Sequence, residues 1–383
     1  MNIKVIIIMN SLLKIIILIC LQFAVSLGFA QNYKDLAKDL IKTKLESELE
    51  YDWTDALLTW AIVDNFERLE ISKSDLNKII KFYQHHDHKD LVVTSPDLLV
   101  SVIGALKLHD KGFSFKNIEK KSIDFILSEP KNKLGTFDHV GTEHRFFWWA
   151  PKTSFFVSSS IWTDSLIMYL IPSALFARKL KNEELQKFVR RQHKVFYSKL
   201  FDGVLYKHAY FLDDQILYPQ GKYYWLRGNA WVLFSLVELY ELETSKDQKA
   251  YYRSLFLELT QNLLNFLPEK GLFPTVLTEK KIDNYVDTAG NSILLYSFLK
   301  AARLEIYNDP KLIKRLWEGL NKFIQKKDND TYLTSCSGPT TAFSYYWYYT
   351  KIVGKKRNLG YCLGPLIMAL GELERQSYSL ELN

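Results

Sequence analysis

Apolar side chains recur at helical spacing along almost the whole chain after Asn32. Leu36, Leu40, Ile41 and Leu45 set the pattern, because residues three or four positions apart share one face of a helix. The pattern predicts helices over residues 33–49, 55–69, 73–83, 98–108, 117–127, 161–179, 183–197, 232–239, 248–266, 289–305, 309–325, 341–352 and 363–375. No strand-like alternation extends over a useful length, and no Ser-, Gly- or Pro-rich linker interrupts the series.

The predicted helices follow one another in pairs joined by short connections, which favours a single all-α domain of stacked helical hairpins over residues 31–383. The loops between the pairs are rich in Trp, Tyr, His, Asp and Gly. These loops cover residues 135–151, 203–225, 271–287 and 336–345. Loops of this composition at the ends of a helical scaffold would line one face, and such loops commonly carry function.

The first 30 residues are typical of a signal peptide. Lys4 and Lys14 are their only charges, an apolar run extends from Ile15 to Leu27, and Gly28 and Ala30 supply small residues before Gln31. An uncleaved membrane anchor is the alternative, although the run is short for a membrane span. We therefore predict export, to the periplasm, with cleavage and no stable membrane association afterwards.

The formal net charge of +7 suits an acidic substrate without requiring one. The sequence has no block of Lys and Arg and no RNA- or DNA-binding motif, so it gives no indication of a nucleic-acid partner. The chain also has no G-x-S-x-G elbow, Walker loop or zincin helix, which excludes the commonest serine-hydrolase, nucleotide-binding and metalloprotease classes. Cys336 and Cys362 remain after signal cleavage, and either a bridge or two buried thiols is compatible with the sequence.

The segment from Gln84 to His88 contains three histidines and Asp87. Adjacent histidines point to different sides, and the segment has no distant partner, whereas a metal site needs three or four converging ligands. His139 and His144 in the long loop are likewise without a companion ligand. We predict no metal and no other cofactor.

The segment from Tyr223 to Leu233 places Trp225, Arg227 and Trp231 around a Gly228-Asn229 pair. Glycine and asparagine both tolerate positive φ, so the pair predicts a tight turn before a buried helix. A guanidinium can bind a carboxylate through two parallel hydrogen bonds, and indoles can stack on a sugar ring. This combination of residues would suit an anionic sugar. The alternative is a structural arginine that binds backbone carbonyls among core tryptophans.

Asp164 stands at the start of an apolar segment that contains Met168. If its carboxyl faces the interior, burial should raise its pKa, as a proton donor requires. Alternatively, Asp164 caps the helix that begins at Ser165, and periodicity alone favours this interpretation. His208, flanked by tyrosines in a loop, would hold a substrate oxygen or tune a carboxylate, or else lie on the surface.

Four separated motifs together resemble the unsaturated glucuronyl and rhamnogalacturonyl hydrolases of glycoside hydrolase family 105 and the related family 88. Trp162 to Met168 resembles the family's W-x-D-x-x-x-M, and Gly203 to His208 resembles its Gly-Leu-x-x-His with one extra residue. Trp225 to Trp231 resembles W-x-R-G-N-G-W, with Ala230 in place of the last glycine. Leu363 to Glu372 resembles the closing Gly- and Ala-containing helix, and the segment Asp287-Thr288-Ala289-Gly290 resembles a helix start.

This resemblance implies an (α/α)6 barrel with the site at one end. It implies hydration of the C4=C5 double bond of a terminal unsaturated uronic acid, with Asp164 protonating C4 and then activating water for attack at C5. It also implies that the uronate is bound by His208, Trp225, Arg227, Trp231 and Met168. The family's second aspartate has its nearest counterpart in Asp97, although the neighbours of Asp97 depart from the family pattern.

The expected partner is therefore an acidic unsaturated oligosaccharide. Two alternatives stay open: a non-catalytic glycan-binding barrel that kept the aromatic residues, and a sugar epimerase, which would need a second histidine facing His208. The sequence does not indicate which polysaccharide is the source of the substrate.

Overall fold

The computed structural model describes residues 33–89, 93–141, 159–269 and 271–381. Within this part of the chain, each helix of an inner ring contacts the next, and α14 contacts α3, so the ring is closed. The inner helices are α3 (Trp53–Asn65), α5 (Val102–His109), α8 (Leu170–Leu180), α10 (Leu226–Leu242), α12 (Thr288–Arg303) and α14 (Gly360–Glu381).

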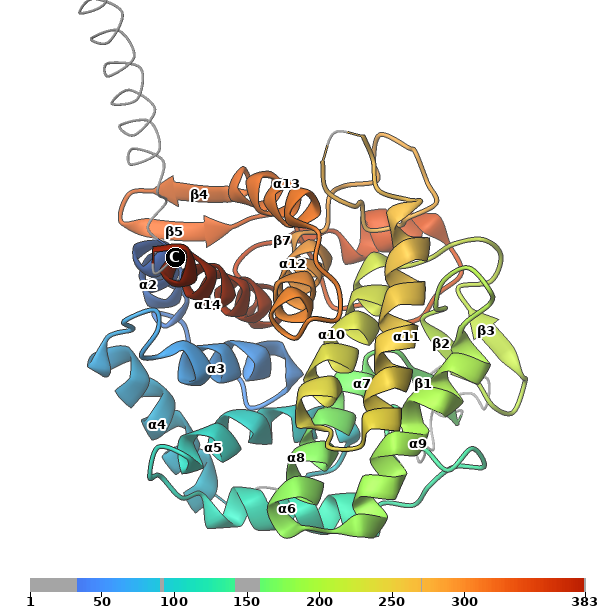
Figure 1. The fold of residues 1–383 in the computed structure, drawn as a ribbon, viewed down its shortest axis with the longest axis horizontal. Coiled ribbons are helices and arrows are strands. Elements are labelled where there is room, and N and C mark those ends of the chain that lie inside the picture. The colour runs from blue at the N-terminus through green and yellow to red at the C-terminus, as the bar shows by residue number, and fades with distance from the viewer. Residues whose placement is uncertain (1–32, 90–92, 142–158, 270, 382–383) are drawn as a thin grey trace, which may run out of the picture.

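A second set of helices alternates with the inner ones along the chain and packs outside them. These outer helices are α2 (Tyr33–Lys44), α4 (Lys73–His88), α6 (Lys116–Ser128), α9 (Glu183–Leu200), α11 (Lys246–Leu264) and α13 (Pro310–Asn321). In Figure 1 the blue α2 lies beside the dark red α14, so the first and last hairpins meet. The predicted (α/α)6 barrel is confirmed.

Composition separates the two sets of helices. The inner helix α10 is buried at every position from Leu226 to Leu239, as expected for a helix enclosed by neighbours on all sides. The outer helix α13 buries one stripe, Leu312, Ile313, Leu316, Trp317 and Leu320, at the i, i+3, i+4 spacing of an amphipathic helix. One hydrophobic cluster extends from Leu36 to Leu373 and joins the two sets.

Three predicted helices have a different form. The helix expected over 161–179 is divided into strand β1 (Ser160–Trp162), helix α7 (Ser165–Met168) and α8. Pro172, in the first turn of α8, has no N–H to donate back to Met168, so a break between α7 and α8 is favoured. The segment 98–108 begins as the 3₁₀ helix η1 (Pro96–Ser101). The segment 341–352 starts as a loop over 341–345 and becomes helical only from Tyr346, ending in the π-helix η3 (Tyr348–Val353).

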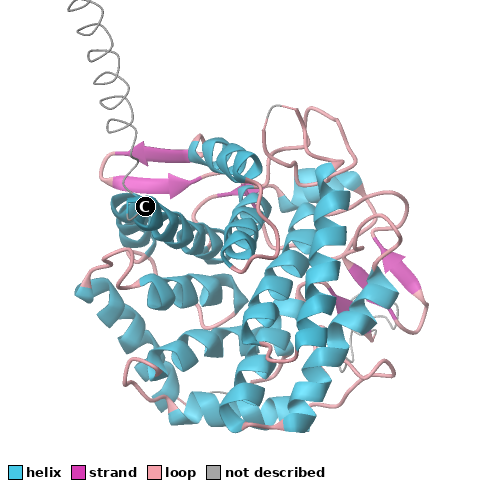
Figure 2. Cartoon of the chain, viewed as in Figure 1, coloured by secondary structure: helices cyan, strands magenta, loops and turns pink. Residues whose placement is uncertain are grey.

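The described part of the chain also contains a few short strands, although its sequence shows no strand-like alternation over a useful length. Short antiparallel strands, magenta in Figure 2, lie in the connections between helices. They are β1–β2–β3, with β2 at Ala209–Phe211 and β3 at Ile216–Tyr218, then β4 (Ile324–Lys327) with β5 (Asp330–Leu333), and β6 (Cys336–Ser337) with β7 (Lys355–Lys356). Each has two to four residues, which is too short for alternation to be recognised in a sequence.

Cys336 and Cys362 form a disulfide that joins β6 to the first turn of α14, which settles the question that the sequence left open. The predicted signal peptide, His144 and most of the loop that follows Gly141 lie outside the described residues. In the described part of the chain, no helix combines the length and apolar character that crossing a bilayer requires.

Candidate active site

A cavity of about 300 Å³ opens at the end of the barrel where the inner helices begin. It takes Trp53 from the start of α3 and Arg227 from the start of α10. Four residues that the sequence singled out share its wall: Asp97, Asp164, Met168 and Arg227. The other lining residues are Trp53, His139, Val140, Trp162, Pro339, Thr340 and Thr341.

Asp164 does not cap a helix. It precedes α7, but its carboxylate accepts no bond from the amides of that helix. Instead, its Oδ2 lies 3.0 Å from Nε2 of His208, and its side chain remains 15% exposed toward the cavity. The interpretation that periodicity favoured was therefore wrong, because a partner 44 residues away in the sequence holds the side chain.

The pKa of Asp164 is lowered, not raised as the sequence suggested. Burial by itself raises the pKa of this carboxyl, but the facing His208, His139 and Arg227 together outweigh that effect. The pKa of His208 is also lowered, because burial of the imidazole outweighs the attraction of Asp164. Near neutral pH the site therefore holds an ionised aspartate beside a neutral histidine.

The position of His208 is fixed by its neighbours. The Asn229 side chain accepts from the Tyr206 N–H at 2.9 Å and donates to the Tyr206 carbonyl at 3.0 Å, two residues before His208. The N–H of Thr163 donates to the His208 carbonyl at 2.9 Å, next to the pairing of β1 with β2. The imidazole packs against Trp225, with ring centroids 4.1 Å apart. His208 is thus buried, and the surface alternative is excluded.

Gly228 and Asn229 do not form a tight turn; both belong to the first turn of α10. The reason for a glycine here is close approach rather than positive φ. A Cβ at position 228 would lie 2.9 Å from Thr163 Oγ1 and 2.9 Å from Trp225 Cε3. The small residue lets the start of α10 pack closely against the segment that carries Asp164.

Arg227 combines the two roles that the sequence presented as alternatives. Its guanidinium donates to the Ser337 carbonyl at 2.6 Å and the Gly338 carbonyl at 2.9 Å, so it does bind backbone carbonyls. It also lies between the rings of Trp225 and Tyr361, 4.6 and 4.7 Å from their centroids. The same group forms part of the cavity wall and contributes positive charge next to Asp164.

His139 is a cavity residue that sequence reasoning considered only as a metal ligand. Its ring stacks on Trp162 with centroids 4.3 Å apart, and its Nδ1 lies 3.1 Å from Ser165 Oγ and 3.8 Å from Asp97 Oδ1. It therefore links Asp97, on η1, to the start of α7. The only sequence signal was its place in an aromatic-rich loop.

Three of the predicted binding residues, His208, Trp225 and Trp231, lie behind the cavity wall. Trp225 is buried between His208 and Arg227 and supports both. Trp231 is 1% exposed, packs near Phe234 in the barrel core and is not among the residues that line the cavity. The helical spacing that places Trp231 below Arg227 also carries it one turn deeper into the core.

The histidine-rich segment at the end of α4 has a structural role. Asp87 accepts a bond from the Ile118 N–H at 2.9 Å and so satisfies the start of α6. Within the described ranges, no three His, Cys, Asp or Glu side chains converge as metal ligands.

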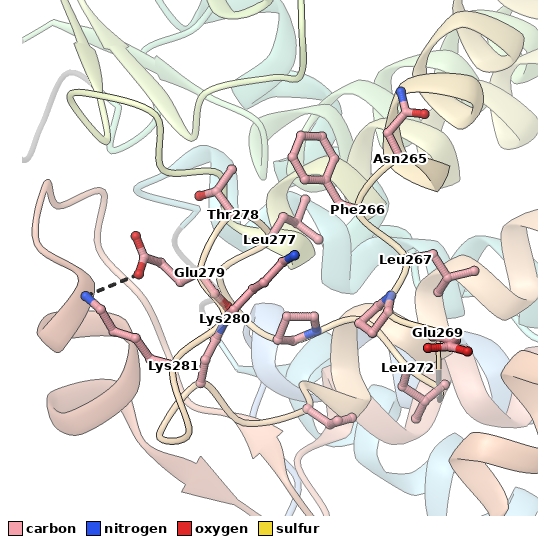
Figure 3. Close-up of a pocket in the computed structure, with 14 residues that line it drawn as sticks. Asn265, Phe266, Leu267, Glu269, Leu272, Leu277, Thr278, Glu279, Lys280 and Lys281 are labelled. Carbon is pink, nitrogen blue, oxygen red and sulfur yellow. Dashed lines mark hydrogen bonds and ion pairs between the residues drawn. The ribbon is translucent and has the colours of Figure 1, made fainter.

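A larger cavity, of about 840 Å³, is lined by the connection between α11 and α12 (Figure 3). The labelled side chains include Glu279, which is 3.2 Å from Lys281 and therefore already paired. None of the motif residues Asp164, His208 or Arg227 reaches this cavity. Since size alone does not supply chemistry, the smaller cavity is the candidate active site.

Residues 30–377 match the model of Glycosyl Hydrolase Family 88. The chain belongs to this family. The resemblance to families 105 and 88 that the motifs suggested is thereby confirmed. A curated relative, the unsaturated 3S-rhamnoglycuronyl hydrolase of Formosa agariphila, is 22% identical over 231 residues, which are 56% of this chain and 57% of the relative. The chain thus matches little more than half the length of that relative.

Solved structures agree on the fold. A possible GH105 member from Klebsiella pneumoniae superposes with a TM-score of 0.78 at 14% identity, covering 91% of this chain and 94% of that one. The unsaturated glucuronyl hydrolase of Bacillus sp. GL1 superposes with a TM-score of 0.68 at 14% identity, covering 90% and 97%. At these identities the likeness establishes the helical barrel and nothing finer.

Proposed function

We propose that this protein is an exported hydrolase that removes a terminal 4,5-unsaturated uronic acid from oligosaccharides left by polysaccharide lyases. The observation that carries the proposal is the meeting of Asp164, hydrogen-bonded to His208, with Arg227 in the wall of one small cavity. The cavity thus combines a carboxyl group for proton transfer, a cation for a uronate and aromatic rings for a sugar face.

The chemistry starts with proton transfer. A protonated Asp164 gives its proton to C4 of the unsaturated ring, which leaves positive charge at C5 beside the ring oxygen. The resulting carboxylate then takes a proton from water as that water attacks C5. The product is a hemiketal whose collapse opens the ring and releases the next sugar. One carboxyl group serves both steps, so the two-carboxylate scheme of ordinary glycosidases is not required.

The pKa of Asp164, which its neighbours lower, has to rise before this step. A substrate uronate brings a negative charge and displaces water, and both effects raise the pKa of a nearby carboxyl. The substrate itself would therefore convert Asp164 into a proton donor. His208 would keep the carboxyl oriented, and Asp97, beside His139 across the cavity, would hold the sugar hydroxyls or the attacking water.

Positive charge at this end of the barrel favours binding of the uronate. Arg227 is buried there, and the inner helices α3 and α10 begin there, so the positive ends of their dipoles face the cavity. His208, Trp225, Arg227 and Met168 form or support the walls of the proposed subsite for the unsaturated sugar, and Trp231 would act only through the packing beneath it.

The names of two similar proteins share one element of substrate. The Formosa relative is named for unsaturated rhamnoglycuronyl units and the Bacillus structure for an unsaturated glucuronyl residue. We carry over the shared element, an unsaturated uronyl residue at the non-reducing end. Export to the periplasm is part of the proposal; the signal-like segment supports it, as does the Cys336–Cys362 disulfide, since such bonds persist in oxidising compartments.

The test is a panel of pectin-type, ulvan-type and glycosaminoglycan polysaccharides, each digested with a matching lyase and incubated with the purified protein. We expect the ultraviolet absorbance of the unsaturated residue to disappear with at least one digest. Tight binding of every digest without loss of absorbance would instead favour the non-catalytic glycan-binding alternative.

A further inference from the structure

An aromatic segment begins where the wall of the candidate site ends. Pro339, Thr340 and Thr341 line the cavity, and the residues that follow are Ala342, Phe343 and Ser344, then five aromatic residues up to Tyr349. Two of these rings face solvent: Tyr345 is 56% exposed and Trp347 is 50% exposed. Their rings are stacked, with centroids 5.9 Å apart and planes 18° apart.

The segment is held in place by hydrogen bonds at several points. Ser344 Oγ accepts from the Gln220 N–H at 3.0 Å, and the Tyr348 hydroxyl accepts from the Thr341 N–H at 2.9 Å. Tyr349 closes the segment on itself by donating to the Phe343 carbonyl at 2.9 Å. The exposed rings therefore stand on an ordered base, which lowers the entropy that a ligand would lose on binding them.

The same base is continuous with the catalytic end of the barrel. Tyr349 is buried, and its ring lies 6.5 Å from that of Trp225, which in turn packs on His208. Thr341 and Tyr345 are four positions apart in the sequence, so their Cα atoms are at most about 14 Å apart. A chain of a few sugar residues that starts in the cavity can span such a distance.

We propose that Tyr345 and Trp347 form a platform for a distal sugar of the substrate, beyond the residue that follows the unsaturated uronate. This inference rests on the proposed function and identifies oligosaccharides longer than a disaccharide as the preferred substrates. The apolar C–H face of a pyranose would lie on one ring of the pair, which removes exposed aromatic surface from water.

A sugar fits this surface better than a second protein. A stable protein interface buries about 800 Å² on each partner, whereas the platform consists of two neighbouring rings at the edge of a cavity. Rigid tyrosine and tryptophan side chains offer a large contact area with few rotatable bonds, as in other binding surfaces rich in these residues.

The test compares unsaturated disaccharides and tetrasaccharides from the same lyase digest. We expect Trp347→Ala and Tyr345→Ala each to lower kcat/KM for the tetrasaccharide about tenfold, mainly through KM, as loss of one stacked aromatic contact predicts. Hydrolysis of the disaccharide should change less than twofold, because the disaccharide does not reach the platform. Trp347→Phe should restore most of the loss.

Ile352→Ala is the matched control. Ile352 is 65% exposed on η3, close in sequence to the platform, but lacks a ring on which a sugar would stack. It should leave both substrates unaffected. An equal loss on both substrates, no loss on either, or a changed oligomeric state in Trp347→Ala would overturn the platform. If wild-type protein hydrolyses neither substrate, the proposed function fails, and calorimetric binding of the tetrasaccharide to wild type and Trp347→Ala then decides on the platform.

Discussion

Both ends of the barrel carry acidic groups, but the surroundings of these groups differ. Where the inner helices end, Lys300 Nζ lies 2.6 Å from Glu238 Oε1 and 2.8 Å from Glu241 Oε2. Arg303 likewise contacts Glu372, at 3.0 Å. Glu238, Glu241 and Glu372 thus each face a permanent cation. Where the helices begin, the nearest partner of Asp164 is the imidazole of His208, which is neutral near neutral pH.

The difference shows what makes a carboxylate available for chemistry. Burial by itself raises the pKa of Glu241, but the opposite effect of Lys300 and Arg303 is larger and brings the pKa down to about 2. This carboxyl group therefore stays ionised at any ordinary pH. The pKa of Asp164 is also lowered, but this carboxyl group borders a cavity into which a second anion can enter. A carboxyl group whose neighbourhood changes on binding can exchange a proton, whereas one fixed between two cations cannot.

Asp164→Asn should show the largest difference in activity between a substitution at the cavity end of the barrel and one at the opposite end. The amide keeps the size of the carboxyl and the contact with His208 but can neither donate the proton to C4 nor accept one from water. We expect loss of unsaturated-uronate absorbance to slow about 10³- to 10⁴-fold, the upper range for a general acid–base group. Glu372→Gln, an equally conservative change at the opposite end, should retain activity within about threefold. Wild-type rates in Asp164→Asn would end the proposed mechanism.

Arg227→Lys should have the next largest effect. A lysine cannot reproduce the fork that binds the Ser337 and Gly338 carbonyls while it lines the cavity. Loss of about 2–3 kcal/mol of hydrogen bonding to a charged group predicts a decrease in kcat/KM of about 100-fold, with KM raised. Arg303→Lys is the counterpart at the other end, and steady-state kinetics on it should match wild type. Equal losses in the two variants would show that the effect is one of general stability.

Glu372→Gln should instead affect folding. Both carboxylate oxygens of Glu372 accept from Arg303 Nε, at 3.2 and 3.0 Å, and the side chain is only 6% exposed. Removing its charge should lower the free energy of unfolding by about 2 kcal/mol, measured by urea denaturation. Asp164→Asn should change the free energy of unfolding by less than about 1 kcal/mol, since among the described residues no lysine or arginine forms an ion pair with Asp164. The reverse order would remove the contrast between the ends.

The smallest of the expected effects is a shift in the pH profiles of kcat/KM and kcat. Because Asp164 must be protonated to act, kcat/KM should fall as pH rises through the lowered pKa of the free enzyme. The corresponding limb of kcat should lie at higher pH, because the bound uronate raises the pKa of Asp164. In His208→Gln the limb of kcat/KM should also move to higher pH, since His208 lowers that pKa. A limb that does not move would mean that another group titrates.

The ring of helices could be predicted because its cause is local: apolar residues recur at helical spacing, and each hairpin needs a neighbour to cover it. The small sheet β1–β2–β3 could not be predicted, because each strand is only three residues long and β1 pairs with β2 from a much later segment of the chain. The same limit explains the two errors at Asp164. Burial was inferred from its own segment, whereas His208, His139 and Arg227 reach it from other segments.

The motif residues themselves were found because their types are unusual for their positions. A lone aspartate before Ser165 and an arginine between tryptophans stand out in an apolar sequence. His139 gave no such signal, since its role depends on Trp162 and Asp97 meeting it in space. Trp231 looked equivalent to Trp225, and only the depth of α10 in the barrel distinguishes them.

The disulfide has a consequence for how the site matures. Cys336 precedes the carbonyls that bind Arg227, and Cys362 follows Tyr361, whose ring covers the other side of the guanidinium. Ser337, Gly338 and Tyr361 all come from the last quarter of the chain, and the disulfide joins the two segments that carry them. Protein made in a reducing host should fold its barrel yet hold uronates weakly until the thiols are oxidised.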